Sequence, residues 1–167
     1  MCEVCNNVFT EEQLNNITYL DCSECPNIKQ LPESLPNLKI LAVYDTNITS
    51  IPSYPALESL YCFNTSLVSL PELPKVRKII ANNSNLDFIR DDYYRLETLN
   101  IDYSQVSTIP DTLISLSWLS ANHTNIDELS HKLISLEWLS IENTKVINMP
   151  KKMLSLQYLN CSNTGVR

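Results

Sequence analysis

The chain has 167 residues and a net charge of −7 at neutral pH, with 44% hydrophobic and 19% charged residues. This composition is typical of a folded domain that buries a core, and the acidic balance disfavours DNA or RNA binding, which needs a basic surface. A single glycine, Gly165, excludes glycine-rich phosphate loops and the GxSxG turn of hydrolases. With two histidines and no catalytic constellation around them, the sequence predicts a protein that is not an enzyme.

Residues 1–16 are predicted to form an N-terminal cap. They contain neither the basic nor the apolar segment of a signal peptide. No apolar run in the chain approaches the roughly 18 residues of a membrane span, so we expect a cytoplasmic location away from membranes. Thr10 and Gln13 fit a capping box, and Phe9 with Leu14 fits a hydrophobic staple. These signals predict a short helix over residues 11–16.

Four cysteines near the N-terminus have the spacing of a zinc site. Cys2, Cys5, Cys22 and Cys25 read C-x2-C-x16-C-x2-C, which suits four thiolates around a tetrahedral Zn²⁺. One extra residue before Ile28, relative to later repeats, suggests a turn reshaped for a ligand. Two alternatives remain. In the first, the cysteines form no bond, and the second pair simply occupies ordinary repeat positions. In the second, the cysteines form disulfides, which the absence of a signal peptide disfavours.

From residue 17 onward the sequence repeats with a period near 20 residues. The repeats begin at Ile17, Leu38, Leu57, Val76, Leu96, Leu116, Leu136 and Leu156. Their shared pattern is L-x-x-L-x-Φ-x-x-[ST]-x-Φ-x-x-Φ-P, where Φ is apolar. The Ser or Thr at the ninth position predicts a ladder of hydroxyls that bond to turn backbone.

This pattern resembles the leucine-rich repeat family over residues 17–167, in about 7.5 repeats. The resemblance implies a solenoid with a parallel β-sheet on its concave face and an irregular or extended convex side, because repeats this short leave no room for a convex helix. In length the repeats are similar to those of bacterial secreted effectors and some large DNA viruses. A single repeat cannot bury its leucines alone, so neighbouring repeats must stack.

Aromatic residues gather at the third, fifth and seventh positions of the repeats, which strand alternation turns out of the sheet. These 24 positions hold seven of the 13 aromatics, where random placement puts about two. Besides Tyr19 they form two clusters, one of Tyr44, Tyr61 and Phe63, and one of Trp118, Trp138 and Tyr158. Exposed Trp and Tyr dominate the energetics of interfaces. The sequence therefore predicts a non-enzymatic module that binds a protein partner through its concave face.

The alternative is a structural or self-associating repeat unit. In that case two copies form a homodimer through the concave face or through the C-terminal end, where the repeat pattern continues to Thr164 without a capping segment after it.

Overall fold

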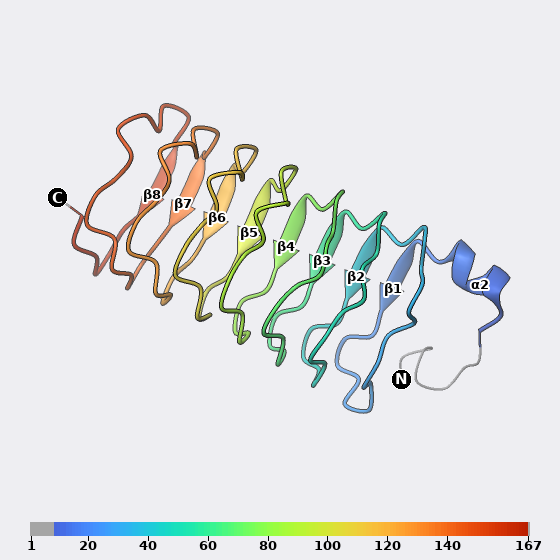
Figure 1. The fold of residues 1–167 in the computed structure, drawn as a ribbon. Coiled ribbons are helices and arrows are strands. Elements are labelled where there is room, and N and C mark those ends of the chain that lie inside the picture. The colour runs from blue at the N-terminus through green and yellow to red at the C-terminus, as the bar shows by residue number, and fades with distance from the viewer. Residues whose placement is uncertain (1–8, 167) are drawn as a thin grey trace.

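The computed structural model describes residues 9–166, which form one short helix followed by eight three-residue strands in a single parallel sheet (Figure 1). Helix α2 spans Glu11–Asn16. The strands are β1 (Tyr19–Asp21), β2 (Ile40–Ala42), β3 (Ser59–Tyr61), β4 (Lys78–Ile80), β5 (Thr98–Asn100), β6 (Trp118–Ser120), β7 (Trp138–Ser140) and β8 (Tyr158–Asn160). They pair in chain order, so the predicted solenoid with one strand per repeat is confirmed.

The register between strands aligns equivalent repeat positions. Leu119 on β6 pairs with Leu139 on β7, and the same fourth position is aligned along the whole sheet. Both leucines are fully buried, whereas Leu159 on the last strand β8 is 42% exposed. This difference shows that each repeat buries its apolar residues against the next one, as expected for a stacked array.

Behind the sheet, one core position, three residues before the start of the next repeat, is Leu or Met in most repeats but Tyr in two of them. Tyr54 and Tyr93 are almost fully buried. Their hydroxyls donate to the carbonyl oxygens of Pro32 (2.8 Å) and Pro71 (2.6 Å). Burial raises the pKa of both phenols, so they remain neutral donors. The irregular fourth repeat is thus accommodated in the core, with Arg90 in place of the usual proline.

Each strand leads into a sharp turn at the eighth repeat position. There the backbone is left-handed, with φ between 52° and 57° at Glu24, Asp45, Asn64, Asn83, Tyr103, His123, Asn143 and Asn163. Asn and Asp tolerate this conformation better than most residues, which explains their frequency at the position. In every repeat before the last, the N–H of this residue bonds to a carbonyl of the next repeat, as Asp45 does to the Phe63 carbonyl at 3.1 Å.

The predicted hydroxyl ladder lies directly after this turn. The ninth-position hydroxyls of Thr46, Thr65, Ser84, Thr124, Thr144 and Thr164 donate to the carbonyl three residues earlier, at 2.6–2.8 Å. Ser104 departs from the pattern, because its buried Oγ has no hydrogen-bond partner among the described residues. At the first repeat the position is taken by Cys25.

Helix α2 covers the N-terminal end of the array. The capping box is present: the Gln13 N–H donates to Thr10 Oγ1 at 3.3 Å, and the Thr10 N–H donates to Gln13 Oε1 at 2.8 Å. Leu14 and Ile17 pack, partly buried, against the core. The predicted helix over residues 11–16 is therefore confirmed. Within residues 9–166, no helix is long and apolar enough to cross a membrane.

Candidate protein-binding face

Three large aromatic side chains form a continuous stack on the concave face. Trp118, Trp138 and Tyr158 begin strands β6, β7 and β8 and are aligned in register. The ring centroids lie 4.4 Å and 4.8 Å apart, with interplanar angles of 9° and 5°. This separation matches the spacing of neighbouring strands. The inner ring faces are shielded by stacking, so the two indoles are half-buried, while Tyr158 is 46% exposed.

The second predicted cluster is split between two kinds of contact. Tyr44 and Phe63 stack with their centroids 4.4 Å apart and an interplanar angle of 6°. Tyr61 lies on the strand β3, where Lys78 Nζ sits 5.1 Å from its ring centroid. The structure thus brings Tyr44 and Phe63 together and directs Tyr61 into a cation–π contact with β4.

A hydrogen-bonded polar ladder, which the sequence reasoning missed, runs beside the Trp118–Trp138–Tyr158 stack. Ser120 Oγ donates to the Asp102 carboxylate at 2.8 Å, and Ser140 Oγ donates to Asn122 Oδ1 at 2.7 Å. The backbone N–H groups of Asn122 and Glu142 each donate at 2.7 Å to the seventh-position side chain one repeat earlier. The run of Ser, Asn and Asp at the fifth and seventh positions was the available signal.

The ladder also modifies the expected outward-facing surface. Ser120 and Ser140 lie on the concave face, yet both are only 3% exposed. Ala42, at the same repeat position, is similarly covered. Small side chains at the fifth position therefore form a floor between larger neighbours, and the accessible surface is made mainly by the third and seventh positions.

The ionisable groups on this face are mostly acidic. Among the third, fifth and seventh positions they are Asp21, Lys78, Asp102 and Glu142. Burial raises the pKa of Asp21, but hydrogen bonds from the hydroxyl and N–H of Ser23 outweigh it and lower the pKa below its ordinary value. The Tyr19 hydroxyl also donates to this carboxylate, at 3.0 Å. These positions of the concave face therefore carry a net negative charge.

The predicted four-cysteine site is only partly within the described residues. Cys2 and Cys5 lie outside them, whereas Cys22 and Cys25 are buried in the core. Residues 9–166 contain no cluster of three or more His, Cys, Asp or Glu placed to hold a metal. Cys62 occupies the same repeat position as Cys22, and burial raises the pKa of its thiol to about 12. The zinc site remains a prediction.

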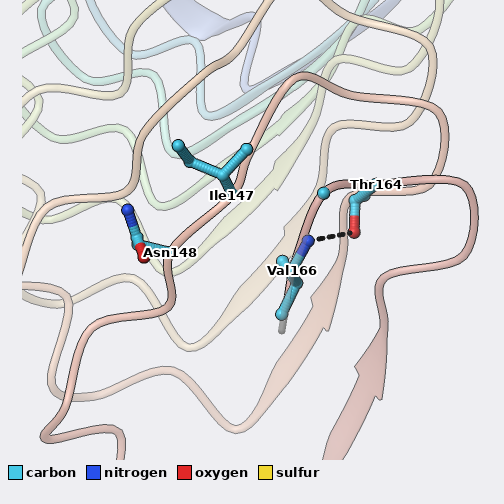
Figure 2. Close-up of a pocket in the computed structure, with 5 residues that line it drawn as sticks. Ile147, Asn148, Thr164 and Val166 are labelled. Carbon is cyan, nitrogen blue, oxygen red and sulfur yellow. Dashed lines mark hydrogen bonds between the residues drawn. The ribbon is translucent and has the colours of Figure 1, made fainter.

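A hollow lies between the last two repeats (Figure 2). It is lined by Ile147, Asn148, Thr164, Gly165 and Val166, and the Val166 N–H donates to Thr164 Oγ1 at 3.4 Å. A Cβ on Gly165 would come within 2.5 Å of Ile147 Cγ2, so glycine permits the close approach of the two turns. Among the described residues, no titratable side chain lines the hollow.

Comparison with solved structures settles the architecture. The chain superimposes on internalin C2 of Listeria monocytogenes with a TM-score of 0.87 and 17% identity, covering 95% of this chain and 77% of that one. For YopM of Yersinia enterocolitica the TM-score is 0.79 at 23% identity, with 90% and 34% covered. The chain has the leucine-rich repeat fold.

A Shigella effector leucine-rich repeat domain is also similar, with a TM-score of 0.74, 24% identity and coverage of 92% and 72%. The chain spans half the length of a matching leucine-rich repeat protein of Leptospira interrogans. No protein-family model and no curated protein matches the sequence. The expected likeness to repeats of bacterial effectors is confirmed at the level of fold.

Proposed function

We propose that the chain is a non-enzymatic interaction module whose concave face binds a protein partner, with the Trp118–Trp138–Tyr158 stack as its main contact. The observation that carries the proposal is this stack of three rings, which is accessible to solvent along its length although indole is costly to leave in water. Aromatic side chains of this kind form the energetic centres of protein interfaces.

The surroundings of the stack support a specific mode of binding. The ring faces contact one another, so a partner meets their edges and the outer face of Tyr158. The adjacent polar ladder is internally hydrogen-bonded and requires little ordering when a partner arrives. A partner segment that lays apolar side chains along the stack and basic groups over Asp102 and Glu142 fits this surface. Among the structural neighbours, a plant peptide hormone receptor was solved in complex with RGF2.

Affinity capture from lysate with the chain as bait, followed by calorimetry on the captured protein, tests the proposal. We expect the Trp118→Ala/Trp138→Ala variant to bind at least about 30-fold more weakly, as for an interface hot spot worth about 2 kcal/mol. Tyr103→Ala is the matched control, because Tyr103 is 56% exposed and stacks on His123 at 4.3 Å outside the concave positions. Equal losses in the two variants would contradict the proposed site.

Folding must be checked in the same variants. Removing Trp138 abolishes two ring stacks, each worth about 0.5–1.5 kcal/mol, so a loss of about 1–3 kcal/mol in unfolding free energy is expected. Leu139→Ala, one residue along and fully buried, should cost about 2–5 kcal/mol through cavity formation. Binding measurements at a temperature well below both unfolding transitions separate lost contacts from lost folding.

A further inference from the structure

The chain turns along one edge of the solenoid before it enters each strand (Figure 1), and these turns carry a second row of apolar residues. Just before each strand from β2 to β8 the chain makes a tight turn, such as the one closed by the Leu116 N–H and the Leu113 carbonyl at 3.1 Å. The first central residue of this turn is apolar in seven successive repeats. These residues are Pro36, Pro55, Pro74, Tyr94, Ile114, Ile134 and Leu154.

Turn geometry explains only the first three of them. Proline is favoured at the second position of a β-turn, because its fixed φ suits the conformation. The other four, Tyr94, Ile114, Ile134 and Leu154, have no such reason, and we call them the edge row. Their exposed fractions are 59%, 54%, 55% and 92%. A contiguous exposed apolar patch of this kind marks an interaction surface.

The edge row is held in place by hydrogen bonds between repeats. Ser115 Oγ donates to the Tyr94 carbonyl at 3.0 Å, and Ser135 Oγ donates to the Ile114 carbonyl at 2.8 Å. The turns of Tyr94, Ile114 and Ile134 are therefore tied together, and their side chains present a fixed surface rather than independent loops.

Charged residues flank the edge row and change sign along it. The turn before Tyr94 carries Asp91 and Asp92, the next carries Asp111, the next carries His131 and Lys132, and the last carries Lys151 and Lys152. Arg90 bonds to Asp92 at 2.8 Å, and the exposed Arg95 directly after Tyr94 offsets the charge of Asp91, so the first of these turns has no net charge. Lys132 lies 3.1 Å from Asp111 on the exposed surface. The flank is thus neutral at the Tyr94 end, acidic at Asp111 and increasingly basic toward Lys151 and Lys152.

We propose that the edge row binds a second copy of this chain in antiparallel orientation, about a two-fold axis between the turns of Ile114 and Ile134. This symmetry places Ile114 against Ile134 of the second copy, and Tyr94 against Leu154 of the second copy. It also places Asp91 opposite Lys151 and Asp111 opposite Lys132. A parallel arrangement would bring the Lys151–Lys152 turns of the two copies together, so their repulsion favours the antiparallel one.

The proposed contact involves only four turns from each copy. We therefore expect it to bury less surface than a standard interface, which buries about 800 Å² per partner. We therefore expect reversible, concentration-dependent association. The concave faces are not used in this contact, so a dimer would present two of them and gain avidity for a partner with two binding sites.

Sedimentation velocity of the full chain, from micromolar to near-millimolar concentration, tests the proposal. The wild type should approach the mass of two 19.1 kDa chains. Ile114→Ser/Ile134→Ser should remain a monomer, whereas Val68→Ser, which alters an exposed apolar residue elsewhere, should dimerise like the wild type. A wild type that stays monomeric throughout overturns the proposal, as does dimerisation that the Ile114→Ser/Ile134→Ser variant retains.

Charge exchange separates this interface from any other self-association. One variant carries Lys132→Glu/Lys151→Glu, and a second carries Asp91→Lys/Asp111→Lys. Each alone should dimerise at least about tenfold more weakly. An equimolar mixture should restore dimers, because both sets of opposite charges meet again in the heterodimer. Failure of the mixture to recover, or loss of dimers in the Trp118→Ala/Trp138→Ala variant, would place the contact elsewhere and refute the antiparallel edge pairing.

Discussion

Ser84 and Ser104 offer a matched test of the hydroxyl ladder. They occupy the same position in adjacent repeats and are buried to nearly the same extent, at 4% and 2% exposure. Ser84 Oγ donates to the Ala81 carbonyl at 2.6 Å, whereas Ser104 Oγ has no partner within the described residues. The same Ser→Ala substitution therefore removes a hydrogen bond at one position and an unsatisfied hydroxyl at the other.

The two substitutions should change the free energy of unfolding differently: one should lower it, and the other should leave it unchanged or raise it. Ser84→Ala loses a bond with a net value of about 0.5–1.5 kcal/mol and deprives a buried carbonyl of a donor, so we expect a loss of about 1–2 kcal/mol. Ser104→Ala relieves the desolvation of an unpaired hydroxyl and should be neutral or stabilising. For a chain of this length each kcal/mol corresponds to about 2–4 °C in Tm.

Thermal and urea unfolding followed by circular dichroism measure both effects. The Tm of Ser84→Ala should fall by about 2–8 °C, and that of Ser104→Ala should stay the same or rise. An equal fall in the two variants would show that the ladder bond is not the source of the stabilisation, and that the serines matter through packing alone.

Two further predictions concern the metal and the pH dependence. We propose one zinc ion per chain at the four-cysteine site, which elemental analysis can measure. The Cys22→Ser variant should lose the zinc, and the Cys62→Ser variant should keep it. A wild type that holds well below one zinc per chain would exclude the site. The hydrogen bond from Arg90 lowers the pKa of Asp92. The pair is partly exposed, so it adds about 1 kcal/mol or less to the free energy of unfolding. This stabilisation is present above the ordinary Asp pKa of about 3.9 and is lost as the pH falls below it. Arg90→Ala should therefore be less stable than the wild type at pH 6, and denaturant unfolding across pH should show the gap closing below about pH 4.

The strands and the helix were predictable because their signals are local and repeated. The fourth-position leucines fixed the repeat length, and Thr10 with Gln13 marked the start of α2. The alternation of side chains placed Trp118 and Trp138 on one face, and the strand spacing brought them into contact. Eight copies of one pattern reinforce each other in a way that a single motif does not.

Other features depend on which neighbours meet in space. The orientation of Tyr61 toward Lys78 instead of the Tyr44–Phe63 stack depends on side-chain positions on two strands. The polar ladder from Asp102 follows from side chains that bend along the sheet to reach the next repeat. The periodicity of the sequence predicts which face of the sheet a side chain lies on. The hydrogen-bond partners between repeats can be identified only from the three-dimensional register of the strands.

The hydroxyl ladder has a consequence for how such a chain can change in length. In each case the donor and the carbonyl belong to the same repeat, as with Thr124 and Ala121. Duplication or deletion of one whole repeat in the gene therefore leaves the remaining turns closed. Duplicating residues 116–135 would add a tryptophan to the concave stack and an isoleucine to the edge row in a single event. Both surfaces would lengthen together, so recombination could adjust their reach without redesigning the turn.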